Sequence, residues 1–143
     1  MERILIADPD EVLAAVYSEE LAEDGYLVTS CSDSTKLMDA IVSQKPDLIL
    51  IDTQMVLHPG EGFYREIENH LPEVPPVLYT SSLRPKPKKW AIPPERFVRK
   101  TRDLKLLKNK ISSALSGMPA GKKRKTRLPK EQMSFLEKGG KSR

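Results

Sequence analysis

The chain has 143 residues, of which 38% are hydrophobic and 31% are charged, a composition typical of a globular protein rather than a disordered or membrane-spanning one. Its single cysteine excludes an internal disulfide, and its two histidines have no partners at the spacing of a structural zinc site. The net charge of +4 is unevenly distributed: residues 1–121 carry 15 Lys/Arg against 18 Asp/Glu, whereas residues 122–143 carry 9 against 2. The sequence therefore predicts a globular part followed by a basic tail.

Membrane insertion and secretion are not expected from this sequence. No apolar stretch approaches the length of a transmembrane helix. A predicted strand follows almost directly after Met1, which leaves no room for a secretory signal. We therefore expect a cytoplasmic protein.

Strand and helix patterns alternate along residues 1–116. Apolar runs typical of strands lie at 3–7, 26–30, 47–52, 75–79 and 96–99. Helical patterns lie between them: one ending at Gly25, one ending at Pro46, one over 60–71, and a last one beginning near Asp103. Four prolines between Leu83 and Pro94 make a long helix there implausible, so the fourth helix is shortened or missing. This alternation predicts an α/β fold with a doubly wound, five-stranded parallel sheet.

Polar residues gather at the ends of the predicted strands. Asp8 and Asp10 follow the first strand, Asp52 ends the third, Thr80 follows the fourth and Lys100 follows the fifth. In open α/β sheets the carboxyl ends of the strands form the ligand-binding edge. The sequence therefore predicts chemistry at this edge.

The order and spacing of these residues resemble the receiver domain of bacterial response regulators. The resemblance covers residues 1 to about 116 and includes Met55 and Gly60 after Asp52, and Phe97 three residues before Lys100. It implies the flavodoxin-like strand order 2-1-3-4-5, which sets strands one and three side by side. It also implies a receiver domain over 1–116 and a C-terminal tail over 117–143.

The resemblance further implies a phosphoacceptor site. Asp52 would accept a phosphoryl group from a histidine kinase or phosphotransfer protein. Asp8, Asp10 and Asp52 would hold Mg²⁺, to which Gln54 could offer its carbonyl oxygen, and a cluster of oxygen ligands suits this ion.

Three further residues have implied roles in binding or in switching. Lys100 and Thr80 would stabilise the charge on the phosphoryl oxygens. Phe97 occupies the place of the aromatic residue that moves when the family switches state. The general alternative for Phe97 is a core position, and the two roles are compatible.

The sequence also departs from the receiver pattern. Pro9 replaces the second acidic residue after strand one and has no side chain able to bind a metal or its water. Thr101 replaces the proline that usually follows the lysine, and the segment 84–90, with Trp90, replaces the fourth helix. Two hypotheses therefore stand: a single-domain response regulator that signals by protein contact, and a degenerate receiver that acts as an adaptor without phosphorylation.

Both hypotheses describe a signalling module rather than a turnover enzyme. A flavodoxin-like enzyme is disfavoured because the loops after strands one and three contain no glycine-rich phosphate cradle. The basic residues of 122–130 could contact a downstream protein or the phosphates of a nucleic acid, and 129–138 could form a short helix on binding.

Overall fold

A five-stranded parallel sheet forms the centre of the protein. The computed structural model describes residues 1–82, 92–101 and 103–117. The strands are β1 (Arg3–Ala7), β2 (Leu27–Cys31), β3 (Leu48–Asp52), β4 (Val77–Ser81) and β5 (Phe97–Arg99). They lie in the order β2-β1-β3-β4-β5, and each neighbouring pair is parallel. The predicted fold class and strand order are confirmed.

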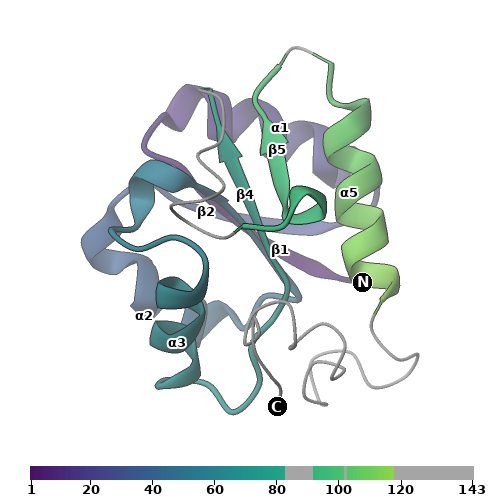
Figure 1. Cartoon of the computed structure of the whole chain (residues 1–143). Helices are drawn as coiled ribbons and strands as arrows, with labels where there is room; N and C mark the ends of the chain where they lie inside the picture. Colours follow the sequence, from purple (N-terminus) through teal and green to yellow (C-terminus); the bar gives the residue numbers. More distant parts are fainter. Residues whose placement is uncertain (83–91, 102, 118–143) are drawn as a thin grey trace.

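Helices cover both faces of this sheet (Figure 1). The helices of the described residues are α1 (Glu11–Glu23), α2 (Leu37–Gln44), α3 (Glu61–Glu68) and α5 (Lys105–Ser116). Short 3-10 turns lie at η1 (Ser34–Lys36), η2 (Thr53–Met55) and η3 (Pro94–Arg96). No helix of the described part of the chain is long and apolar enough to cross a membrane.

Several predicted features fall outside the described residues. These are the shortened or missing fourth helix, Trp90, and the tail with its basic cluster and short helix. The predicted division into a domain over 1–116 and a tail over 117–143 stays a prediction. Within the described residues, the third helix is shorter than the predicted 60–71, and β4 extends to Ser81, so that Thr80 lies inside the strand.

The core consists of two apolar layers, one on each face of the sheet. Residues of α2 and α3, such as Ile41 and Phe63, pack against one face, and residues of α1 and α5, such as Leu21 and Ile111, pack against the other. All five residues of β3 are buried, because helices cover both sides of this central strand. The acidic residue Asp52 therefore stands at the end of the most deeply enclosed strand.

The first helix differs from its sequence pattern in which side chains it buries. The apolar positions that predict this helix are Val12, Leu13, Val16, Leu21 and Ala22, and of these five only Leu21 is fully buried. Ala14 and Tyr17 complete the inner face, whereas Val12 and Val16 are exposed over 77% and 48% of their surface. The outer face of α1 is therefore partly apolar.

Candidate functional site

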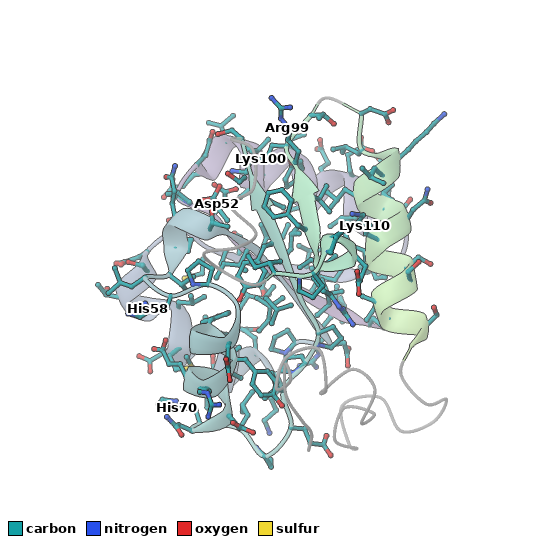
Figure 2. The ribbon with its side chains drawn as sticks, in the orientation of Figure 1. Asp52, His58, His70, Arg99, Lys100 and Lys110 are labelled. Carbon is teal, nitrogen blue, oxygen red and sulfur yellow. The ribbon has the colours of Figure 1, made fainter. Side chains whose placement is uncertain are left out.

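Three charged side chains meet at the carboxyl end of the sheet. Lys100 Nζ lies 2.7 Å from Asp8 Oδ2 and 2.5 Å from Asp52 Oδ2. The side chains are 14%, 2% and 6% exposed, respectively. Figure 2 shows Lys100 and Asp52 together at this end of the sheet, with His58 and His70 apart from them on the side of α3. We call Asp8, Asp52 and Lys100 the ion triad.

The backbone fixes both carboxylates of the ion triad. Asp8 follows β1 and Asp52 ends β3, and these strands are neighbours in the sheet. Asp8 Oδ1 accepts a hydrogen bond from the N–H of Asp10 at 2.8 Å, and Asp52 Oδ1 accepts one from the N–H of Gln54 at 2.7 Å. Each carboxylate thus has one oxygen bound by the backbone and the other by Lys100.

Lys100 is positioned by β5 and by a second lysine. Its N–H donates to the carbonyl of Ser81 at 2.9 Å, which continues the pairing of β4 with β5. Lys110 of α5 donates from Nζ to the carbonyls of Pro94 and Phe97, both at 2.8 Å, and so holds the start of β5 (Figure 2). Sequence reasoning missed Lys110, because hydrogen bonds to the carbonyl oxygens of another segment leave no signal in the local sequence pattern.

The ion triad keeps Lys100 charged. Burial lowers the pKa of Lys100, but the hydrogen bonds and negative charges of Asp52 and Asp8 raise it more, so that the net shift is upward. A second titratable group, Tyr17 on the inner face of α1, senses the same charges. Burial raises its pKa, Lys100 lowers it, and Asp8 and Asp52 raise it. Sequence reasoning also missed Tyr17, whose spacing from Ala14 and Leu21 places it on the buried side of α1.

Thr80 lies beside the ion triad, and Phe97 lies in the core. Thr80 is buried and is the register partner of Asp52 across β3 and β4. Phe97 is the register partner of Tyr79 and packs in the core layer of α2 and α3. The core position of Phe97 agrees with the general alternative, and its part in switching stays a prediction.

The two remaining predicted metal ligands do not join the ion triad. Asp10 is exposed, and its carboxylate accepts the N–H of Leu13 at 3.0 Å, which caps the start of α1. Gln54 is also exposed and contacts Asp52 through its backbone. Within residues 1–82, 92–101 and 103–117, no three His, Cys, Asp or Glu side chains are grouped to hold a metal ion. The carboxylates available beside Lys100 are therefore those of Asp8 and Asp52.

The loop that follows Asp52 is held by a buried tyrosine. The hydroxyl of Tyr79 accepts a hydrogen bond from the N–H of Gly60 at 2.8 Å, directly before α3. Burial raises the pKa of Tyr79 far above its ordinary value, so the hydroxyl stays neutral. Gly60 has φ +83°, a conformation that favours glycine. Tyr79 therefore fixes the end of the loop that begins at Asp52.

We expect Tyr79→Phe to lower the free energy of unfolding by about 1 to 3 kcal/mol, because it leaves the buried N–H of Gly60 without its acceptor. Urea denaturation of the two proteins measures this difference. Equal unfolding free energies would contradict the role of the hydroxyl in holding the loop.

Comparison with known proteins agrees with this geometry. Residues 4–112 match the sequence profile of the response regulator receiver domain. The chain is 33% identical over 86 residues to protein-glutamate methylesterase/protein-glutamine glutaminase 2 of Syntrophus aciditrophicus, a match covering 59% of this chain and 24% of that protein. It is 26% identical over 82 residues to the transcriptional regulatory protein YxdJ of Bacillus subtilis, covering 57% of this chain and 35% of that protein.

Solved structures share the same fold. The response regulator TrrA of Thermotoga maritima, solved in complex with Mg²⁺-BeF, superposes with a TM-score of 0.66 at 24% identity and covers 80% of this chain and 100% of its own. A two-component response regulator of Clostridium difficile gives a TM-score of 0.69 at 20% identity, covering 84% of this chain and 100% of its own.

The two curated relatives are much longer than the region they share with this chain. The match spans about a quarter of the methylesterase and about a third of YxdJ, so neither relative's whole activity follows from it. The profile match, in contrast, extends over most of the described residues and includes Asp8, Asp52, Thr80 and Lys100. Together with the strand order and the ion triad, it establishes that this chain belongs to the response regulator receiver domain family.

Proposed function

We propose that this receiver domain accepts a phosphoryl group on Asp52 from a histidine kinase or phosphotransfer protein and signals by protein contact. The observation that carries the proposal is the position of Lys100 Nζ between the carboxylates of Asp8 and Asp52. The positive charge of Lys100 offsets one of the two negative charges that would otherwise repel a phosphoryl group. A cytoplasmic location, and a signalling role without enzymatic turnover, belong to the same proposal.

The transfer needs an oxygen nucleophile and cationic stabilisation. One oxygen of Asp52 forms a bond to phosphorus as the bond between phosphorus and the donor's imidazole nitrogen breaks. The electron pair of the broken bond stays on that nitrogen, and because the other ring nitrogen of the donor carries a proton during the transfer, the imidazole leaves neutral. Lys100 is placed to form an ion pair with the phosphoryl oxygens, and Thr80, the register partner of Asp52, is placed to donate its hydroxyl to one of them.

The residues at the site fit a Mg²⁺ ion held by two carboxylates. Mg²⁺ is commonly bound by one or two carboxylates together with waters and phosphate oxygens, and Asp8 and Asp52 provide this pair. The ion, when bound, would neutralise negative charge on the phosphoryl oxygens. Lys100 already contacts one oxygen of each carboxylate, and Pro9 adds no ligand, so Lys100 and the metal compete for the same atoms. We infer weak Mg²⁺ binding that the phosphoryl donor strengthens.

The adaptor hypothesis has one observation in its favour. Asp10, which directly follows the altered Pro9 position, uses its carboxylate to cap α1. If Asp8 and Asp52 do not suffice to bind the ion, the receiver fold would act without phosphorylation. The two hypotheses differ in whether the protein takes up a phosphoryl group in the presence of Mg²⁺.

We expect wild-type protein incubated with acetyl phosphate and Mg²⁺ to gain the mass of one phosphoryl group, and Asp52→Asn to gain none. Intact mass spectrometry of both proteins, with Mg²⁺ and with EDTA, measures the adduct. Asp24→Asn is the matched control, because Asp24 is exposed and lies at the far end of α1. An equal adduct on Asp52→Asn would assign the acceptor elsewhere.

The role of Asp10 is tested in the same experiment. Asparagine caps a helix as well as aspartate does, but it carries no charge for a metal ion. We therefore expect Asp10→Asn to keep the phosphoryl adduct and Asp8→Asn to lose most of it. Absence of any adduct on folded wild-type protein, with both acetyl phosphate and a purified kinase as donors, would favour the adaptor hypothesis.

A further inference from the structure

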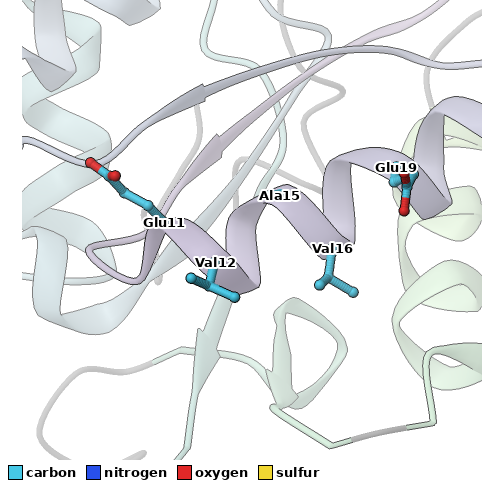
Figure 3. Close-up of a pocket in the computed structure, with 5 residues that line it drawn as sticks. All are labelled: Glu11, Val12, Ala15, Val16 and Glu19. Atoms are coloured by element: carbon cyan, nitrogen blue, oxygen red, sulfur yellow. The ribbon is translucent and has the colours of Figure 1, made fainter.

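The outer face of α1 is an exposed apolar strip with acidic residues at both ends. Val12, Ala15 and Val16 lie at helical spacing on this face and, with Glu11 and Glu19, line a shallow groove (Figure 3). Val12 and Val16 point to the same side of α1. We call these five residues the α1 groove. Together Val12, Ala15 and Val16 form a small exposed apolar surface that a short apolar segment can cover.

The segment that contains α1 is strongly acidic. Residues 4–35 contain eight Asp/Glu and no Lys/Arg. Lys108 of α5 forms ion pairs with Glu20 and Asp24, at 3.2 and 3.3 Å, at the far end of α1. These ion pairs do not include the two acidic residues of the α1 groove. A segment that fills the α1 groove should therefore combine apolar side chains with several positive charges.

The C-terminal tail has this chemistry. Residues 122–143 carry nine Lys/Arg against two Asp/Glu, and the apolar residues Met133, Phe135 and Leu136 follow the basic cluster 122–127. The tail follows α5, and the ion pairs of Lys108 place this helix against the end of α1 that lies opposite the groove.

The tail is long enough to reach the groove. The 13-residue helix α1 is about 20 Å long at 1.5 Å per residue. An extended chain covers at most about 3.5 Å per residue, so residues 118–132 can span about 50 Å. Because the tail belongs to the same chain, its effective concentration at the groove is high, which favours weak contacts that separate molecules would not form.

We propose that the C-terminal tail docks on the α1 groove of its own chain, with Met133, Phe135 and Leu136 covering Val12 and Val16 and the basic residues facing the acidic helix. Glu11 is the first residue of α1, and Asp10 before it contacts Asp8 of the ion triad. A docked tail therefore stands beside the entrance to the site. The docking does not depend on phosphorylation of Asp52.

Paramagnetic broadening in the full-length chain tests the proposal. A nitroxide is attached to Ser134→Cys in a Cys31→Ser background, which removes the one native cysteine. We expect the amide signals of Val12 to Glu19 to lose intensity several-fold, and those of α3, on the other face of the sheet, to keep theirs. Equal intensities on α1 and α3 would overturn the proposal.

Charge reversal supplies the matched control. Glu11→Lys with Glu19→Lys should restore most of the α1 intensity, and so should high salt. Glu66→Lys with Glu68→Lys makes the same charge change on exposed positions of α3 and should restore none. Broadening of α1 that survives the first pair of substitutions, or that disappears with the second, would contradict docking on the acidic groove.

Mixed samples separate docking within one chain from docking between two. Spin-labelled protein without ¹⁵N is mixed with ¹⁵N-labelled protein without the spin label. We expect no broadening of α1 in this mixture at low concentration. If the broadening is as strong as in the chain that carries both the nitroxide and ¹⁵N, the groove binds the tail of a second copy, and the intramolecular proposal is overturned.

Discussion

Lys100→Met is expected to lower the free energy of unfolding by about 3 kcal/mol or more at neutral pH, the range observed when one partner of a buried ion pair is removed. The variant leaves Asp8 and Asp52 close together and buried without their shared cation. Arg99→Met is the matched control, because Arg99 is the exposed neighbour of Lys100, and its loss should change stability by less than about 0.5 kcal/mol. Urea denaturation of the three proteins measures both differences.

The effect of Lys100→Met should depend on pH in a defined direction. Lys100 has a pKa above its ordinary 10.5 in the folded protein, so folding favours its protonated form. Its contribution to stability is therefore fully present below pH 10.5 and is lost as the pH rises through the raised pKa.

The double variant Lys100→Met, Asp52→Asn provides the decisive comparison. It removes one negative charge together with the positive one, so we expect it to be more stable than Lys100→Met alone. A double variant no more stable than the single one would contradict the view that Lys100 stabilises the fold by offsetting the repulsion between the two carboxylates.

Phe63→Ala is expected to destabilise the fold by about 3 to 5 kcal/mol, the usual loss for a large side chain removed from a packed core. Phe63 is 1% exposed and makes an edge-to-face contact with Tyr79, with ring centroids 6.5 Å apart. The cavity left by Phe63 would let the ring of Tyr79 move. Because the Tyr79 hydroxyl holds Gly60, the loop after Asp52 would become less ordered. Leu106→Ala, at a position 54% exposed, is the control and should cost less than about 1 kcal/mol.

Chemical denaturation gives the unfolding free energies of both variants, and a phosphoryl uptake assay reports the state of the loop. We expect folded Phe63→Ala to take up phosphoryl groups more slowly than wild type. If Phe63→Ala loses several kcal/mol of unfolding free energy but takes up phosphoryl groups at the wild-type rate, the packing of α3 does not control the loop.

Most of the fold could be predicted because the local patterns and the parallel-sheet rules agree. The apolar run 47–52 predicted a fully buried strand, and β3 is buried throughout. The outer face of α1 could not be predicted in this way. Val12 and Val16 match a helical period, but the period alone does not say which apolar stripe faces the sheet when Ala14, Tyr17 and Leu21 offer a second one.

The candidate site could be predicted in its composition but not in its contacts. Strand ends bring Asp8, Asp52 and Lys100 to one edge, and the structure joins these three directly. Asp10 lies apart from them because its carboxylate accepts the N–H of Leu13 and so caps α1. Residue spacing alone does not distinguish a capping carboxylate from a metal ligand. Lys110 acts through two carbonyl oxygens of a distant segment, and such contacts leave no pattern in the local sequence.

The two sides of the ion triad rest on supports of unequal rigidity. Asp52 ends the central strand β3, paired on both sides, whereas Lys100 follows the three-residue edge strand β5, which α5 holds through Lys110. Substitutions that move Asp52 change the buried strand β3 and therefore threaten folding, whereas the exposed Arg99, directly before Lys100, can be changed at smaller cost. In evolution, and equally in redesign, the reactivity of this site is therefore easiest to retune from the side of the cation, with the acceptor left in place.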